Sequence, residues 1–141
     1  MMPELYRSAY QRIEYDPAYS LIKRVLTVNS ETDDWPEHQR EWKEYASLVR
    51  NYQPENIFVD ATGFDFLLLK DMQEWINKNV IAIYNDIRLK KWAILIPPQF
   101  LHQVSIEQTI ESNPFNTFET QYFESEQEAM DWLHKNGAVM H

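Results

Sequence analysis

Apolar and polar positions alternate in two segments near the start of the chain, and this alternation predicts a β-hairpin. The segments RIEY and YSLIKRVLTV flank Asp16-Pro17-Ala18 within residues 12–28. Asp followed by Pro favours a turn, because Pro presets the backbone φ angle. One face of the second segment is mostly apolar, as in a half-buried strand. That face carries Ile22, Arg24, Leu26 and Val28.

A helical period replaces the alternation after a polar segment at residues 29–34. Pro36 follows Trp35 and suits the first turn of a helix, and Pro54 ends the pattern. The apolar residues of one predicted face are Trp42, Tyr45, Val49 and Tyr52. We expect solvent on the other face, which carries Glu37, Arg40, Glu41, Lys43 and Glu44.

Three short apolar runs predict further strands: NIFVDA at 56–61, WAILI at 92–96 and FETQYF at 118–123. Apolar residues three or four positions apart predict a helix over about 66–89. Asn77 to Asn79 allows a break there, so two shorter helices fit equally well.

Two capping boxes predict further helix starts, one at Ser105 to Gln108 and one at Ser125 to Glu128. Gly137 suits the C-cap of the last helix, where a left-handed conformation is needed. Strands separated by helices imply parallel neighbours. The expected fold is therefore a single α/β domain over 1–141, with its core at about 12–133. Its mixed sheet has about five strands, an antiparallel N-terminal hairpin followed by parallel βα units, and about four helices.

Composition narrows the function. The 141 residues carry a formal net charge of −9, which disfavours binding to nucleic acid or to anionic membranes. The chain has no Cys, which excludes disulfides, thiol nucleophiles and Cys-type metal sites. Its two glycines, far apart, cannot form a phosphate-binding loop. No apolar run approaches the length of a transmembrane segment, so we expect a cytoplasmic protein. Because the chain carries no recognisable cofactor or metal motif, we also expect no cofactor and no metal.

Few side chains are arranged for chemistry. His38 and Glu41 are one helical turn apart and offer two metal ligands, but a solvated helix face explains them as well. Arg88, Lys90 and Lys91 form the densest basic group, which we interpret as a cationic helix end.

The best candidate site follows the predicted strand NIFVDA. Ligands of open α/β sheets bind outside the carboxyl ends of strands. The residues expected there are Asp60, Thr62, Phe64, Asp65, Phe66 and, after the next strand, His102. An Asp–His pair at this edge is one possibility for acid–base chemistry; a capped helix start with an exposed histidine is the other.

The assembled pattern resembles the STAS-like family of anti-sigma-factor-antagonist-like domains, in the subgroup related to CRAL-TRIO lipid-binding domains. The resemblance covers about 12–133. After the N-terminal hairpin and an acidic helix, it rests on IFVDATGFDF, MQEWINKNV, WAILIPPQFLHQVSIEQ and YFESEQEAMDWL. It implies a bacterial domain used for binding rather than turnover. The stretch that carries the phosphorylated serine of the family's switch proteins is Leu68-Leu69-Lys70-Asp71 here, so no phosphorylation site is expected.

We therefore expect a non-enzymatic binding or regulatory domain. It would recognise a protein partner, a second copy of itself, or a small apolar, lipid-like ligand. The alternative is a small enzyme that uses Asp60 or Asp65 with His102.

Overall fold

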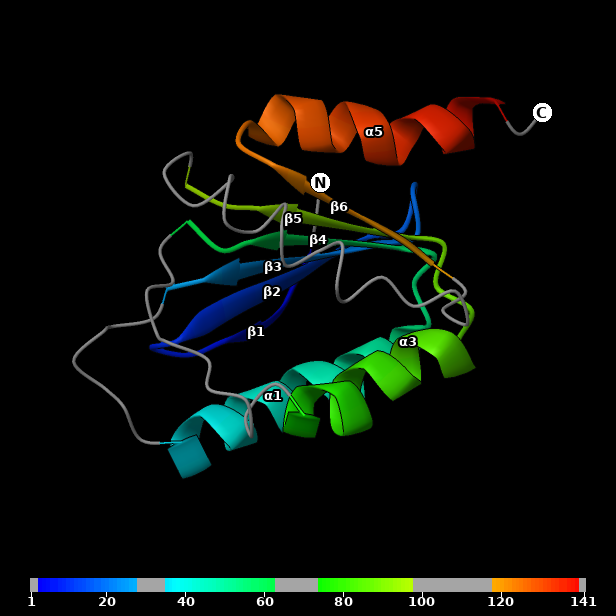
Figure 1. Cartoon of the computed structure of the whole chain (residues 1–141). Helices are drawn as coiled ribbons and strands as arrows, with labels where there is room; N and C mark the ends of the chain where they lie inside the picture. Colours follow the sequence, from blue (N-terminus) through cyan, green and yellow to red (C-terminus); the bar gives the residue numbers. More distant parts are fainter. Residues whose placement is uncertain (1–2, 28–34, 63–73, 98–117, 140–141) are drawn as a thin grey trace.

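The computed structural model describes residues 3–27, 35–62, 74–97 and 118–139. Six strands form one sheet in the order β1-β2-β3-β4-β5-β6 (Figure 1). They are β1 (Glu4–Arg7), β2 (Gln11–Asp16), β3 (Leu21–Leu26), β4 (Asn56–Asp60), β5 (Lys91–Leu95) and β6 (Glu119–Phe123). The helices are α1 (Trp35–Tyr52), a π-helical segment η1 (Asn77–Ile81), α3 (Ala82–Asp86) and α5 (Glu126–Val139). No helix within the described residues is long and apolar enough to cross a membrane.

The predicted fold class is confirmed. Strands β1, β2 and β3 pair antiparallel, and β3 to β6 pair parallel. The predicted hairpin is β2 and β3, in which Gln11 pairs with Leu26 and Asp16 with Leu21. The sheet has six strands rather than five, because the sequence analysis missed β1. That strand has only four residues and its register shifts between Glu4 and Tyr6, so it lacks a readable alternation.

Helices cover both faces of the sheet. Figure 1 shows α1 and α3 on one side and α5 on the other. The larger apolar cluster lies under α1 and α3, where Tyr45 and Val49 of α1 pack with Ile22 and Ile57 of the sheet. The smaller cluster lies under α5 and includes Ala129 and Leu133.

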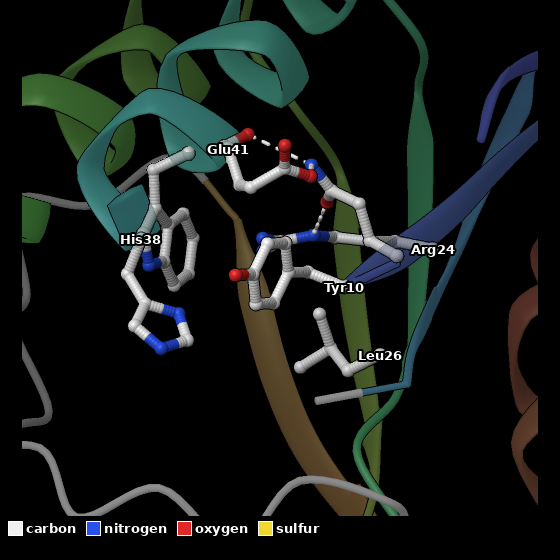
Figure 2. Close-up of a pocket in the computed structure, with 7 residues that line it drawn as sticks. Tyr10, Arg24, Leu26, His38 and Glu41 are labelled. Carbon is white, nitrogen blue, oxygen red and sulfur yellow. Dashed lines mark hydrogen bonds between the residues drawn. The ribbon is translucent and has the colours of Figure 1, made fainter. Parts of the chain in front are cut away.

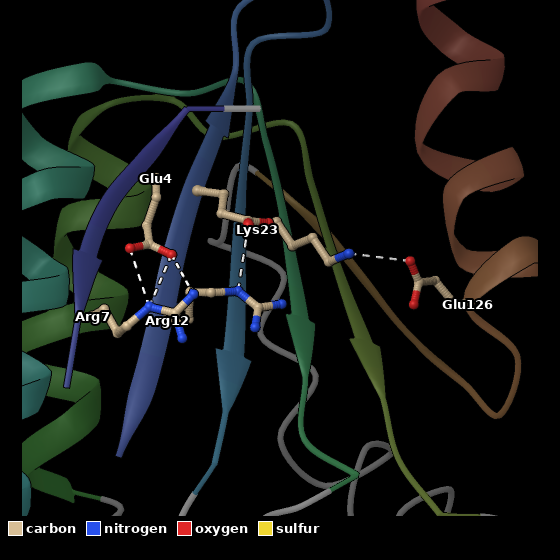
Figure 3. A network of polar contacts seen from close by, with 6 residues as sticks. Glu4, Arg7, Arg12, Lys23 and Glu126 are labelled. Carbon is tan, nitrogen blue, oxygen red and sulfur yellow. Dashed lines mark hydrogen bonds and ion pairs between the residues drawn. The ribbon is translucent and has the colours of Figure 1, made fainter. Parts of the chain in front are cut away.

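The other half of the α5 side carries charged residues of β1, β2 and β3 (Figure 3). Glu4 lies opposite Glu14, and Arg7 lies opposite Arg12. Opposite charges compensate these like pairs, because Arg7 binds Glu4 at 2.7 Å and Arg12 Nε lies 3.3 Å from Glu14. Lys23 reaches α5, where its Nζ lies 3.2 Å from Glu126; side-chain charges thus connect this half of the sheet with the helix.

The predicted break at Asn77 to Asn79 is a π-helical turn inside a helix. The described part of this segment is helical from Glu74 to Asp86, with η1 between α-helical turns. The Asn79 side-chain amide donates to the Trp75 carbonyl at 2.8 Å. A π turn keeps the helix continuous, and it holds an extra residue within one turn.

The capping box at Ser125 is formed in part, since the Glu128 amide donates to Ser125 Oγ at 3.4 Å. The assignment of Gly137 as the C-cap was wrong, because α5 continues to Val139. The capping box at Ser105 to Gln108 lies outside the described residues.

The interpretation of Arg88, Lys90 and Lys91 as one cationic helix end was also wrong in part. Lys91 is the first residue of β5 and is buried, and its Nζ donates to the Trp132 carbonyl at 2.5 Å. Arg88 follows α3 with a positive φ of 58°.

Arg88 completes a Schellman motif at the end of α3. The Leu89 amide donates to the Tyr84 carbonyl at 3.0 Å, and the Arg88 amide donates to Asn85 at 3.2 Å. Tyr84 and Leu89 are both buried, which supplies the hydrophobic contact typical of this motif. A glycine normally occupies the left-handed position, because a Cβ atom is strained there.

We therefore expect Arg88→Gly to stabilise the protein by about 0.5–1 kcal/mol, since the relief of strain exceeds the entropy that glycine loses on folding. Urea denaturation of the purified variant measures the change. Arg88→Ala is the control, because it removes the guanidinium and keeps the Cβ atom; equal stability of the two variants would contradict the prediction.

Candidate binding site

The carboxyl ends of the parallel strands meet at one edge of the sheet. Val25 of β3 pairs with Asp60 of β4, which in turn pairs with Leu95 of β5. The ladder continues one step further, where the Ala61 amide donates to the Leu95 carbonyl at 2.9 Å. We call this the carboxyl edge.

The structure places two of the predicted site residues at the carboxyl edge. Asp60 ends β4, and its Oδ1 accepts hydrogen bonds from the Thr62 amide at 3.0 Å and the Thr62 hydroxyl at 2.6 Å. This local turn fixes the carboxylate, and Thr62 is exposed. The other predicted residues, Phe64, Asp65, Phe66 and His102, lie outside the described residues, so the Asp–His pair stays a prediction.

A small pocket that the sequence analysis did not predict opens between α1 and the end of β3 (Figure 2). Its volume is about 20 Å³, which has room for about one or two water-sized atoms. It is lined by Tyr10, Gln11, Arg24, Leu26, His38, Glu41 and Trp42. Leu26 ends β3 beside Asp60 and Ala61, so the pocket belongs to the carboxyl edge.

The expectation that Glu41 faces solvent was wrong. His38 and Glu41 are 4% and 6% exposed, and both line the pocket. Among the residues that the structure describes, no group of three or more acidic or histidine side chains is arranged to hold a metal ion. Glu41 accepts hydrogen bonds inside a buried polar cluster, and the His38 ring packs edge-on against Tyr10, with ring centres 5.5 Å apart.

Three donors from the N-terminal strands hold the Glu41 carboxylate. Tyr6 Oη donates to Oε2 at 2.9 Å, while Ser8 Oγ and Gln11 Nε2 donate to Oε1 at 2.5 and 3.1 Å. Gln11 Nε2 also donates to the Glu41 carbonyl at 2.8 Å. Burial, together with the hydrogen bond to Glu41, raises the pKa of Tyr6. The carboxylate thus ties α1 to β1 and β2.

Gln11 relays this cluster to a buried cation. Its Oε1 accepts a hydrogen bond from Arg24 Nε at 2.6 Å, and Arg24 is 3% exposed. The guanidinium carbon lies 4.0 Å from the Trp42 ring centre and 4.3 Å from that of Tyr45. Burial lowers the pKa of Arg24, and the neighbouring tyrosines and Glu41 oppose that effect. Arginine nevertheless stays charged in proteins.

Two buried tyrosines lie behind Arg24. The hydroxyl oxygens of Tyr45 and Tyr84 are 2.5 Å apart inside the core, and one hydroxyl donates to the other. Burial raises the pKa of Tyr45 to about 12, and burial together with Tyr45 raises the pKa of Tyr84. Both hydroxyls are therefore neutral hydrogen-bonding groups at physiological pH.

One signal in the sequence pointed to this cluster. Arg24 stands on the otherwise apolar face of β3, between Ile22 and Leu26. A charge in that position is either solvated at an edge or buried with partners. The spacing along β3 does not distinguish the two, because the partners come from β2 and α1.

Comparison of the chain with protein-family models, with curated proteins and with solved structures finds no match. The resemblance to STAS-like domains therefore stays a prediction.

We expect Glu41→Ala to lower the free energy of unfolding by about 2 kcal/mol or more. The half-buried hydroxyls of Tyr6 and Ser8 lose their acceptor, and each donor left unsatisfied costs about 1–3 kcal/mol, whereas Gln11 Nε2 keeps the Glu41 carbonyl. Glu44→Ala is the matched control, because Glu44 is exposed on the same helix and should change stability by less than about 0.5 kcal/mol. Urea denaturation compares the two, and equal losses would contradict the buried role of Glu41.

The tyrosine pair predicts a loss of stability at alkaline pH. The unfolded chain ionises its tyrosines near pH 10, whereas folded Tyr45 stays neutral until about pH 12. Stability is therefore complete below pH 10 and falls as pH rises toward 12, by roughly 2–3 kcal/mol for Tyr45. Urea denaturation at a series of pH values measures the slope.

The double variant Tyr45→Phe and Tyr84→Phe should have a clearly shallower alkaline slope, whatever its stability at neutral pH. Tyr19→Phe is the control, since Tyr19 is 42% exposed and should leave the slope unchanged. An unaltered slope in the double variant would show that other groups cause the loss.

Proposed function

We propose that this protein is a non-enzymatic binding domain that holds a small ligand with an apolar body at the carboxyl edge. The observation that carries the proposal is the pocket between α1 and β3, which combines a buried cation with aromatic walls. Ligand sites in proteins are concave and mostly apolar, with a few fixed polar groups. The STAS-like resemblance supports the same function, since it implies binding rather than turnover.

The walls of this pocket are held in place before any ligand arrives. Glu41 is bound by three side-chain donors, and Gln11 connects it to Arg24. Preorganised polar groups bind with less loss of conformational entropy than mobile ones. The pocket has room for one polar group only, so the body of the ligand would lie outside it, against Tyr10 and the edge at Asp60 and Thr62.

A thermal-shift screen of small amphiphilic compounds, followed by native mass spectrometry, tests the proposal. We expect a ligand that raises the melting temperature and binds one per chain. Tyr10→Ala should weaken it by about tenfold, because aromatic contacts dominate such sites. The matched control is Tyr19→Ala, at the opposite end of β3, which should bind as the wild type does. Only the ligand-free mass and no stabilising compound would refute the proposal.

A further inference from the structure

Arg24 is a buried cation with no ionic partner. Within the described residues, no carboxylate oxygen lies at ion-pairing distance from its guanidinium, whereas three exposed arginines are paired. Arg7 binds Glu4, Arg40 binds Glu37 and Arg50 binds Asp86. Usually the buried charges are the ones with ionic partners, because an unpaired charge costs far more free energy when it is buried than when it is exposed.

Glu41 does not take the place of an ionic partner. The Gln11 amide stands between the two charges, donating to Glu41 and accepting from Arg24 Nε. The carboxylate oxygens already accept from Tyr6 and Ser8 as well. Glu41 therefore weakens the positive field at Arg24, but it accepts no hydrogen bond from the terminal amino groups of Arg24.

The two terminal amino groups of Arg24 have no acceptor in the described part of the chain. A guanidinium has five N–H donors, and the only one used in a hydrogen bond there is on Nε. The guanidinium lines the pocket together with the Trp42 ring, from whose centre its carbon lies 4.0 Å, and its end overlaps the Tyr10 ring in Figure 2. The unused donors therefore face the pocket at the carboxyl edge.

We propose that this pocket binds the carboxylate group of a small organic acid, with Arg24 as the recognition residue. The terminal amino groups form a planar pair that matches two carboxylate oxygens. The pocket is small, with a volume of about 20 Å³, so only the end group of a ligand would enter it. The net charge of −9 and the nearby Glu41 also favour a monoanion over a dianion.

The apolar walls of the pocket favour a ligand whose remaining part is apolar. Leu26, Tyr10 and the Trp42 ring line the pocket together with Arg24. A ligand whose carboxylate reaches Arg24 would place its first methylene groups against these side chains. This inference rests on the proposed function and specifies the chemical class of the ligand.

The test uses the wild-type protein, labelled with ¹⁵N and titrated with acetate or octanoate at constant ionic strength. Acetamide and octanamide are the neutral controls of the same shape. We expect the acids to shift the Arg24 side-chain N–H resonances and the amides to leave them unchanged. Octanoate should bind at least about tenfold more tightly than acetate, because each buried methylene adds about 0.8 kcal/mol. Equal affinity would assign binding to the carboxylate alone and remove the apolar part of the inference.

Arg24→Lys checks the assignment of the Arg24 resonances and tests the role of the planar pair of terminal amino groups. The charge remains, but the planar pair of donors is lost, so carboxylate affinity should fall by about tenfold or more. Arg50→Lys is the matched control, because Arg50 is an exposed arginine paired with Asp86. If Arg24→Lys does not fold, through-bond correlations to the Arg24 backbone amide assign the resonances in the wild type, and the titrations still decide the question.

The outcomes separate this inference from the proposed function. No shift at Arg24 with any acid would overturn the carboxylate assignment and leave the donors to water. Neutral amphiphiles that bind at Tyr10 without moving the Arg24 resonances would overturn it while supporting the binding function. Shifts with acetate but not with chloride at the same concentration would support a carboxylate site over a general anion site.

Discussion

The charge on Arg24 is the constraint around which the α1 side of the structure is organised. A buried guanidinium on the inner face of β3 needs partners from the protein, and its two aromatic neighbours come from α1. Gln11 of β2 accepts from it and connects it to Glu41 of α1. Strand pairing alone leaves the angle of α1 over the sheet open. This chain of polar contacts sets that angle, because it requires particular atoms to meet.

The buried cluster also explains which predictions succeeded. The hairpin was predictable, because its turn residues and its alternation are local in sequence. The burial of Glu41 was not, because acidic residues on a helix are usually solvated and its partners Tyr6 and Ser8 lie 35 and 33 positions away. Those partners stand in and just after β1, the strand that the sequence analysis missed. The missed strand β1 and the wrong expectation that Glu41 faces solvent therefore have the same cause.

The position of Asp60 and Thr62 at the end of β4 was predictable, whereas the pocket at Arg24 was not. The rule for open α/β sheets identified the carboxyl edge, and Asp60 and Thr62 do end β4 there. Arg24 entered the sequence pattern only as an irregularity in an apolar face. Whether a buried charge faces a cavity depends on how a helix packs over a strand. That packing is a long-range property, and local periodicity does not encode it.

The amino edge of the sheet lies opposite the carboxyl edge. Backbone hydrogen bonds link the starts of the parallel strands there: Glu55 donates to Ser20, Lys90 to Glu55 and Glu119 to Lys90, at 2.8–3.0 Å. The chain reaches these positions through left-handed residues that are not glycine, Ser20, Gln53 and Arg88. Each costs about 1–2 kcal/mol, which continuous strand pairing must offset. The carboxyl edge has backbone links of the same kind, in which Thr27 donates to Tyr10, Ala61 to Leu95 and Ile96 to Phe123, at 2.8–2.9 Å. Both ends of the sheet are therefore fixed, and the site proposed at Arg24 is built on strands and a helix, which position side chains more precisely than loops do.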